Sequence, residues 1–230
     1  SRERVVRTLN REATDRVPID LGSHMSTGIS MFAYWRLREY LELSTDEIRV
    51  PDVVQCLAYV DEDVRQRFHV DCVLLEPRWP DEGRWCPREP YTFVVPEAFQ
   101  PRQQRDGTWV ATHGESNMRM PPGGYFFDGG WLNSCWHGLP EDQVIGLYAR
   151  EAERIYKETE YACNFLGYGY GGGLGSFFGG LEQGCRMLTD PDGVLEQNAD
   201  LLERQIQRFD RINEAFGRYI QLITVGNDMG

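Results

Sequence analysis

The sequence predicts an α/β protein in which buried parallel strands alternate with helices. Helical spacing of apolar residues recurs in five segments, at 2–11, 29–42, 51–69, 140–160 and 191–216. Short apolar runs stand between or after them, at 17–21, 70–77, 161–166 and 220–225. These runs are largely continuous, which is typical of parallel strands that are buried on both faces. A series of strands and helices in this order favours a parallel sheet.

The first segments set this pattern. Residues 2–11 place Val5, Val6 and Leu9 on one face among charged residues, which predicts a short helix. Pro18 opens the apolar run 17–21, which ends at Gly22 and predicts the first strand. Residues 29–42 then return to helical spacing.

A longer helix is predicted over residues 51–69. Its apolar stripe consists of Val53, Val54, Leu57, Val60, Val64 and Phe68. Pro51 stands in the first turn, where proline is tolerated because the amide there has no partner inside the helix. The run VDCVLLEP at 70–77 predicts the second strand.

Residues 90–130 differ from the rest because their apolar runs are short, partly alternating and separated by turn residues. We interpret them as an antiparallel β-hairpin excursion, with RDGT at 105–108 as its tight turn. The excursion belongs to a single domain that spans residues 1–230.

The last third of the chain repeats the alternation of helices and strands. Pro140 precedes a predicted helix, and the strand at 161–166 runs into a glycine-rich loop. A long amphipathic helix is predicted over 191–216, and the final strand runs over 220–225.

Composition narrows the function classes and the compartment. The chain has 36 acidic and 24 basic residues and a net charge of −12, which disfavours nucleic acid and anionic membranes as partners. It contains no apolar run of membrane-spanning length, and residues 1–10 do not resemble a secretory signal. The six cysteines include no C-x-x-C pair, so we interpret most of them as buried, reduced thiols of a cytoplasmic protein.

Polar residues or glycines follow each of the four predicted strands. They are Asp20 to His24, Glu76, Gly167 to Tyr170, and Asn227 with Asp228. In parallel α/β folds the functional site lies at the carboxyl ends of the strands. We therefore predict a site at this edge, with His24, Glu76 and Asp228 as catalytic candidates. The alternative for Asp228 is a turn residue or helix N-cap.

Other residues at the same edge are candidates for substrate binding. Asp20, Tyr168, Tyr170, Phe177 and Asn227 follow predicted strands or stand in the glycine-rich loop. The aromatic residues would suit a planar ligand, or else they pack in the core. The loop lacks a G-x-x-x-x-G-K-[ST] motif, which disfavours a nucleotide site. His24 is the favoured acid or base because it lies just beyond the first strand.

Four segments, in order along the chain, resemble the uroporphyrinogen decarboxylase superfamily. They are RERVVRTLNREATDRVPIDLG at 2–22, RFHVDCVLLEP at 67–77, GGLGSFFGGLEQGCRMLTDPD at 172–192 and VGNDMG at 225–230. The resemblance implies a (β/α)8 barrel of the TIM type, of which the chain holds about the first four β/α units with the hairpin as an insertion. It also implies that the chain is cut, or only partly described, after the fourth strand.

The superfamily includes cofactor-independent decarboxylases of uroporphyrinogen, which are carboxy-lyases of porphyrin biosynthesis, and methyltransferases that work with a corrinoid protein. The decarboxylases carry an arginine-rich segment after the first strand, whereas residues 22–35 contain no arginine. They also carry an aspartate after the second strand, where this chain has Arg78. A substrate rich in carboxylates needs guanidinium groups.

These departures favour the methyltransferase branch, with methyl transfer to or from a cobalamin-bearing corrinoid protein and O-demethylation as one form of it. The resemblance implies a zinc ion whose ligands are expected beyond Gly230, so the metal ligands are unknown. The methyl donor or acceptor is then a small molecule, and an oligomer is left open. The alternatives are uroporphyrinogen decarboxylation and a non-catalytic binding protein of the same fold.

Overall fold

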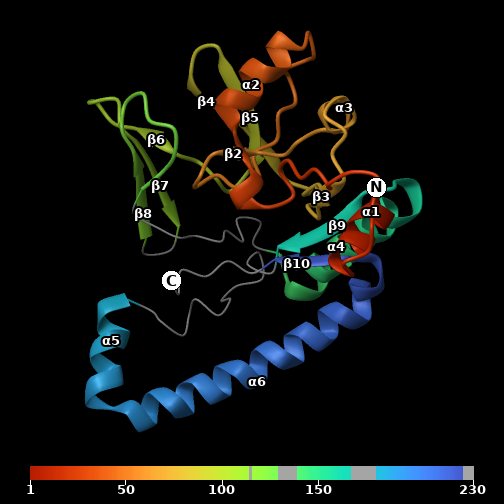
Figure 1. The fold of residues 1–230 in the computed structure, drawn as a ribbon. Coiled ribbons are helices and arrows are strands. Elements are labelled where there is room, and N and C mark those ends of the chain that lie inside the picture. Colours follow the sequence, from red (N-terminus) through yellow and green to blue (C-terminus); the bar gives the residue numbers. More distant parts are fainter. Residues whose placement is uncertain (114–115, 129–138, 167–179, 225–230) are drawn as a thin grey trace.

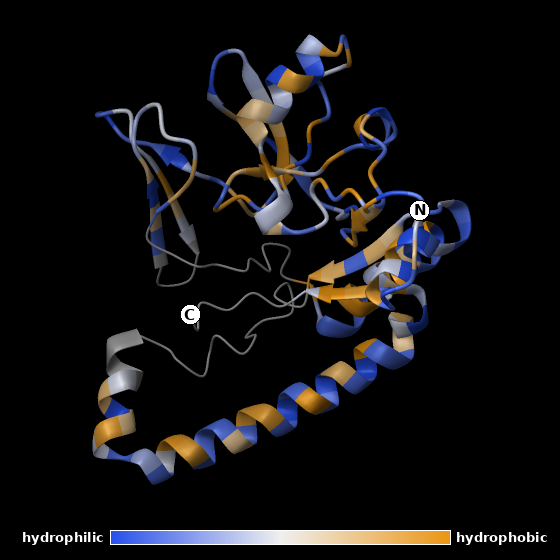
Figure 2. Cartoon of the chain, in the orientation of Figure 1, coloured by the Kyte–Doolittle hydropathy of each residue, from blue (hydrophilic) through white to orange (hydrophobic). Residues whose placement is uncertain are grey.

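A computed structural model of the chain describes residues 1–113, 116–128, 139–166 and 180–224 (Figure 1). Its parallel sheet contains β3 (Cys72–Leu74), β9 (Ala162–Leu166) and β10 (Leu222–Thr224), with β9 in the middle. The three strands lie side by side in chain order. Both pairs are parallel, so the carboxyl ends of the strands share one edge of the sheet. Figure 2 shows that hydrophobic residues dominate these strands, as expected for a sheet buried on both faces.

Helix α4 (Glu141–Glu158) and the C-terminal end of α6 (Pro191–Phe216) cover one face of this sheet. The core between them, which we call the sheet core, contains Val73, Leu75, Tyr148, Ile155, Cys163, Phe165, Ile212 and Phe216. On the opposite face, α1 (Arg2–Leu9) packs Val5 against Cys72 and Ala162. Side chains alternate between the two faces along a strand. Cys163 and Phe165 of β9 lie in the sheet core, so Ala162 and Asn164 point to the side of α1.

The remaining elements build a second core from antiparallel strands and short helices. The helical elements are η1 (Met25–Thr27), α2 (Met31–Tyr40) and α3 (Glu62–Arg67). The strands are β1 (Ile29–Ser30), β2 (Leu57–Ala58), β4 (Glu82–Arg88), β5 (Tyr91–Pro96), β6 (Arg102–Gln103), β7 (Trp109–His113) and β8 (Ser116–Met120). Buried residues such as Phe32, Trp85 and Phe93 form what we call the hairpin core.

The pairing within this region is antiparallel throughout the named strands. Strands β4 and β5 pair with each other, and β7 lies between β6 and β8. Antiparallel strands thus fill much of residues 90–130 and begin earlier than expected, at Glu82. Gly107, with a φ of +85°, occupies the turn at 105–108 between β6 and β7.

The C-terminal helices extend away from the sheet. Asp190 caps α6 by accepting a hydrogen bond from the Gly193 amide, and Pro191 occupies the first turn after α5 (Gly180–Thr189). Ile212 and Phe216 at the far end of α6 are buried in the sheet core, and η4 (Gly217–Tyr219) leads from there into β10. Leu195 and Leu202, nearer its start, are 67% and 46% exposed.

The predicted barrel is not observed. In the described ranges the parallel sheet has three strands and does not close, and the other sheets are small and antiparallel. The prediction of a first strand at 17–21 is also wrong, because these residues form no strand. They contact the sheet region through a backbone hydrogen bond from the Asp71 amide, just before β3, to the Ile19 carbonyl. Val17 is 79% exposed, and Pro18 has no amide proton to donate to a ladder.

The helix predicted over residues 51–69 is wrong over most of its length. Residues 53–56 form a turn, β2 follows, and the helix is confined to α3. The Asp52 carboxylate accepts hydrogen bonds from the amides of Val54 and Gln55, which closes an Asx turn in place of a helical one. Among the described helices, none has the length and apolar character that a membrane crossing requires.

Candidate functional site

The segment from Asp20 to Thr27 folds into a compact loop beside the parallel sheet. The Gly22 amide donates to the Thr27 carbonyl at 2.9 Å, which brings the ends of the loop together. Gly22 has a φ of +82°, and a Cβ atom there would lie 2.4 Å from Cγ2 of Val60. Both the backbone conformation and the close approach to Val60 therefore require glycine at this position.

Asp20 organises the interior of this loop. Its carboxylate accepts hydrogen bonds from the Ser23 amide at 3.1 Å, the Ser23 hydroxyl at 2.8 Å and the Thr27 hydroxyl at 3.0 Å. These three hydrogen bonds tie the carboxylate to both ends of the loop. Asp20 therefore shapes the loop and places a negative charge next to His24.

His24 has one satisfied ring nitrogen and one that has no partner. Its Nδ1 accepts a hydrogen bond from the Ser26 amide at 3.1 Å. The proton of the neutral ring therefore resides on Nε2. Nε2 is buried and has no hydrogen-bond partner within the described part of the chain. Burial lowers the pKa of His24, and the charge of Asp20 opposes this effect, so the ring is neutral at pH 7.

The loop is fastened to the sheet through Asn164, which is 2% exposed in the middle of β9. Its amide group donates to the Ser23 carbonyl at 2.9 Å and to the Ser23 hydroxyl at 3.3 Å. The Thr224 hydroxyl on β10 donates to the Asn164 side-chain oxygen at 2.8 Å. Because its neighbours Cys163 and Phe165 lie in the sheet core, Asn164 points to the opposite face, toward the loop.

Sequence reasoning placed Ser23 at the end of the first predicted strand but missed Asn164 and Thr224 as parts of this cluster. A signal for Asn164 was present, because it is the polar residue inside the otherwise apolar run ACNFL. A buried amide requires partners for its donors and acceptor, so such a residue indicates a polar contact inside the fold. The partners themselves come from segments 141 and 60 residues away, and the pattern of residues does not identify them.

Glu76 lies just beyond β3 but in a different environment. Its carboxylate accepts a hydrogen bond from the Trp79 indole nitrogen at 2.8 Å, and Trp79 packs on the sheet core against Tyr148. Burial raises the pKa of Glu76 to about 7, although the Arg49 charge and hydrogen bonds from Trp79 and Tyr148 oppose the shift. Within the described ranges, the partners of Glu76 are Trp79, Tyr148 and Arg49, and none belongs to the loop around His24, so the two candidates occupy separate clusters.

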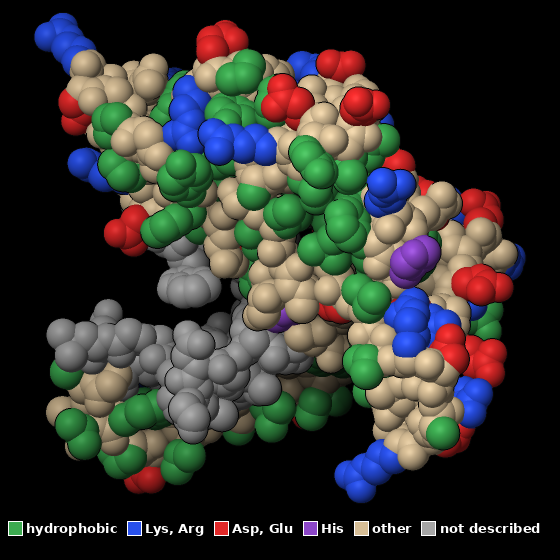
Figure 3. All heavy atoms as spheres, turned by 45° about the horizontal axis from the view of Figure 1, so that its top comes forward, with side chains coloured by type: hydrophobic (Ala, Val, Ile, Leu, Met, Phe, Trp, Pro, Cys, Tyr) green, Lys and Arg blue, Asp and Glu red, His purple; other side chains and the backbone are tan. Residues whose placement is uncertain are grey.

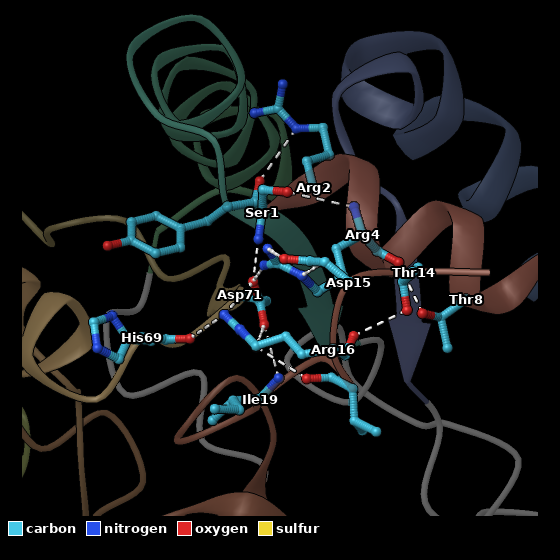
Figure 4. A network of polar contacts seen from close by, with 12 residues as sticks. Ser1, Arg2, Arg4, Thr8, Thr14, Asp15, Arg16, Ile19, His69 and Asp71 are labelled. Carbon is cyan, nitrogen blue, oxygen red and sulfur yellow. Dashed lines mark hydrogen bonds and ion pairs between the residues drawn. The ribbon is translucent and has the colours of Figure 1, made fainter. Parts of the chain in front are cut away.

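Asp71 anchors the segment that leads into the loop (Figure 4). Its carboxylate is 1% exposed, accepts from the Ile19 amide at 2.8 Å and pairs with Arg16 at 2.6 Å and with Arg4. The Ser1 amino group also contacts it. Burial raises the pKa of Asp71, but these hydrogen bonds and charges outweigh burial and bring it to about 2. The charged form of Asp71 thus holds residues 16–19 beside β3.

A cavity of about 390 Å³ lies next to this anchor, lined by arginine and glutamate side chains as well as Asp71. Its charged groups pair with one another, since Arg4 and Arg16 bind Asp71 and Arg65 binds Glu62. Paired charges of this kind are structural, so we do not place the functional site there.

The other predicted site residues, Tyr168, Tyr170, Phe177, Asn227 and Asp228, lie outside the described residues. Within the described ranges, no group of three or more His, Cys, Asp or Glu side chains is arranged to hold a metal ion. Cys72 and Cys163 are free, buried thiols whose pKa burial raises to about 12, which suits a structural role.

Comparisons of the chain with protein-family models, curated proteins and solved structures gave no match.

Proposed function

We propose that the protein is an enzyme that moves a methyl group between a small molecule and a corrinoid protein, by O-demethylation, as the sequence resemblance implies. The observation that supports this proposal is the buried Nε2–H of His24, a hydrogen-bond donor without a partner in the described structure. Natural proteins pair their buried donors, so an unpaired one indicates a group that awaits a ligand.

In this proposal His24 donates its Nε2–H to the ether oxygen that carries the methyl group. When the carbon–oxygen bond breaks, the bonding electron pair stays on that oxygen, which becomes an alkoxide or phenolate. A fixed donor aimed at the developing negative charge lowers the barrier. The corrinoid of the partner protein supplies the nucleophile that accepts the methyl group.

The remaining loop residues have positioning roles. Asp20 and Ser26 fix the orientation of the ring, because Asp20 holds the loop and the Ser26 amide fixes the tautomer. A lowered pKa keeps the ring neutral, so its Nε2–H remains a donor with no charge that the buried site must solvate. We assign no step to zinc, because the described residues bring no set of zinc ligands together.

Uroporphyrinogen decarboxylation has less support. The loop offers Asp20 and a neutral His24 to a substrate, and the nearby Arg4 and Arg16 are engaged by Asp71. Several substrate carboxylates would therefore find no free guanidinium in this cluster. We further propose the cytoplasm as the location, because the five described cysteines are free thiols.

The proposal is tested with His24→Asn. The Asn side-chain oxygen replaces Nδ1 as acceptor for the Ser26 amide, so the substitution removes Nε2–H and keeps the cap. The assay supplies 2-methoxyphenol as methyl donor and reduced cobalamin as acceptor, and it measures the release of catechol. We expect kcat to fall about 100-fold with little change in KM, because the donor acts on charge that develops during the reaction.

The matched control is His69→Asn. His69 is exposed and has a φ of +53°, a conformation that asparagine tolerates, and it lies outside the loop. Its variant is expected to keep the wild-type rate. Equal rates for His24→Asn and wild type, or no demethylation by wild type, would contradict the proposal. Decarboxylation of uroporphyrinogen by wild type would replace it with the alternative.

A further inference from the structure

Arginine and aromatic side chains gather at the surface of the hairpin core. Phe32 and Arg36 belong to α2, Arg88 ends β4 and Tyr91 begins β5. Tyr125, whose ring centre lies 5.5 Å from that of Phe32, completes the group, which we call the arginine–aromatic patch; Phe126 follows it in the sequence. Figure 3 shows arginine side chains lying among hydrophobic side chains on this part of the molecule.

The Arg88 guanidinium lies close to the centres of two aromatic rings. Its guanidinium carbon lies 4.3 Å from the centre of the Phe32 ring and 5.1 Å from that of Tyr125. One of its nitrogens donates to the Gly124 carbonyl at 3.3 Å. Stacking on aromatic faces fixes the plane of a guanidinium and leaves its edge free for a further ligand.

A second arginine, Arg36, contacts the same aromatic group through a hydrogen bond. Its Nε donates to the Tyr91 hydroxyl at 3.0 Å. The Tyr91 ring in turn packs edge-on against the Phe32 ring, with 5.1 Å between the ring centres. A guanidinium has five N–H donors, so most donors of both arginines have no acceptor among the residues that the structure describes.

Neither arginine has an ion-pair partner within the described residues, although the chain carries 36 acidic residues against 24 basic ones. The neighbouring arginines show the contrast. Arg38 on the same helix pairs with Asp61 and Asp63, and Arg84 on β4 pairs with Glu47 at 2.5 Å. Two fixed, unpaired guanidinium groups in so acidic a chain indicate that their carboxylate comes from another molecule.

The aromatic part of the patch has a buried base, formed by Phe32 and Tyr91, and an exposed edge. Tyr125 is 58% exposed and Phe126 is 61% exposed, side by side in the sequence. Protein interfaces are enriched in tyrosine, phenylalanine and arginine, and such residues carry most of the binding energy. The exposure of both rings suits an extended protein segment that lies across them.

We propose that the arginine–aromatic patch docks an acidic segment of a partner protein. Carboxylates of that segment bind Arg36 and Arg88, and an apolar side chain next to them packs on Tyr125. The net charge of −12 opposes an acidic partner at long range, but salt screens that repulsion beyond about 8 Å. Binding is therefore governed by the local cationic surface.

The proposal is tested by selecting a random-peptide library on the immobilised full chain. We expect a consensus with at least two neighbouring Asp or Glu residues and one aromatic or aliphatic residue. The affinity of the selected peptide is then measured by fluorescence anisotropy. Arg36→Gln and Arg88→Gln should each weaken it by about 30-fold, the loss that marks a hot-spot residue.

The matched control is Arg84→Gln, which removes an exposed arginine from β4 that already has a carboxylate partner. It should leave the affinity unchanged. Arg88→Gln also loses its stacking on Phe32, so Arg36→Gln, whose side chain is exposed, tests the proposal without disturbing the core.

Two results would overturn the proposal. One is a selected consensus without acidic residues, or peptide binding that both substitutions leave intact. The other is a concentration-dependent dimer in sedimentation velocity that Arg36→Gln abolishes, because the patch would then bind a second copy of the chain.

Discussion

Asp71 shows how a single buried charge organises the chain around the candidate site. It is 1% exposed and receives hydrogen bonds from the Ile19 amide and from two arginines. A buried carboxylate without partners would be costly, but this one is paired and hydrogen-bonded. The residues it holds, 16–19, lead directly into Asp20 and the His24 loop.

Asp71→Asn is predicted to lower the free energy of unfolding by about 2 kcal/mol, because it leaves two arginines facing a neutral amide. The loss is measured by urea unfolding at pH 7. The control Asp15→Asn removes the exposed partner of Arg4 and should have a smaller effect. Equal losses of unfolding free energy for the two variants would contradict the prediction that the buried carboxylate of Asp71 stabilises the fold more than an exposed one.

The lowered pKa of Asp71 also predicts that the free energy of unfolding depends on pH. The folded pKa of Asp71, about 2, lies below its usual value of 3.8. The unfolded chain therefore binds the proton first, and the stability that Asp71 contributes is present above about pH 4 and is lost as the pH falls toward 2. Urea unfolding at a series of acidic pH values should show this decline, reduced in Asp71→Asn.

At the residue scale the sequence indicated Asp20 and His24 because both follow an apolar run that ends at a glycine. The sequence did not indicate that His24 would keep a free Nε2–H. That property depends on the Ser26 amide, which satisfies Nδ1, and on the neighbours that bury the ring. Such neighbours are set by packing, which residue spacing does not encode.

At the scale of elements, the loop between Asp20 and Thr27 depends on one glycine. Gly22 combines a φ of +82° with a distance of 2.4 Å between its absent Cβ and the Val60 side chain. Gly22→Ala would therefore need both a strained backbone and a shift of Val60, which is itself buried in the hairpin core.

We predict that Gly22→Ala lowers the free energy of unfolding by about 2 kcal/mol and also lowers activity through the displaced His24. The control is Gly184→Ala in α5, where a Cβ atom meets nothing within 4 Å. There alanine should stabilise the protein by about 0.5–1 kcal/mol, since it favours the helix. Calorimetry of both variants tests the pair, and a stabilising Gly22→Ala would contradict the role of the loop conformation.

Elements that depend on local signals were predicted well. Helices α1, α4 and α6 form where helical spacing indicated them, and proline and Asp190 mark the start of α6. The helix expected over 51–69 failed although Val53 and Val60 of its apolar stripe do pack in one core, the hairpin core. Asp52 bonds the amides of Val54 and Gln55 and closes a turn there, and the short strand β2 follows. An apolar stripe alone does not exclude such a competing turn.

At the scale of the whole molecule, Arg49 connects the two cores. Its guanidinium lies 4.7 Å from the centre of the Tyr59 ring, donates to the Pro77 carbonyl at 3.1 Å and approaches Glu82 at 3.7 Å. Arg49 and Glu76 also line a cavity of about 20 Å³ between the cores. The positive charge of Arg49 is one of the effects that keep the Glu76 pKa from rising further.

Arg49→Gln is predicted to raise the pKa of Glu76 above its value of about 7, because it removes a nearby positive charge. Titration of the Glu76 carboxyl carbon by NMR measures the change. The control is Arg78→Gln, an arginine that is exposed and shares the partner Glu82, and it should leave the Glu76 pKa unchanged. A Glu76 pKa that stays the same in Arg49→Gln would contradict this link between the cores.

By itself, the sequence determined the α/β character, the parallel direction of the C-terminal strands and the positions of the principal helices. These features follow from local periodicity, capping residues and turns. The tertiary structure decided that the described sheet stays open with three strands, that residues 17–21 form none, and that Glu76 and His24 occupy separate clusters. Those outcomes depend on contacts between residues far apart in the chain, such as Ser23 with Asn164, whose energies no local pattern contains.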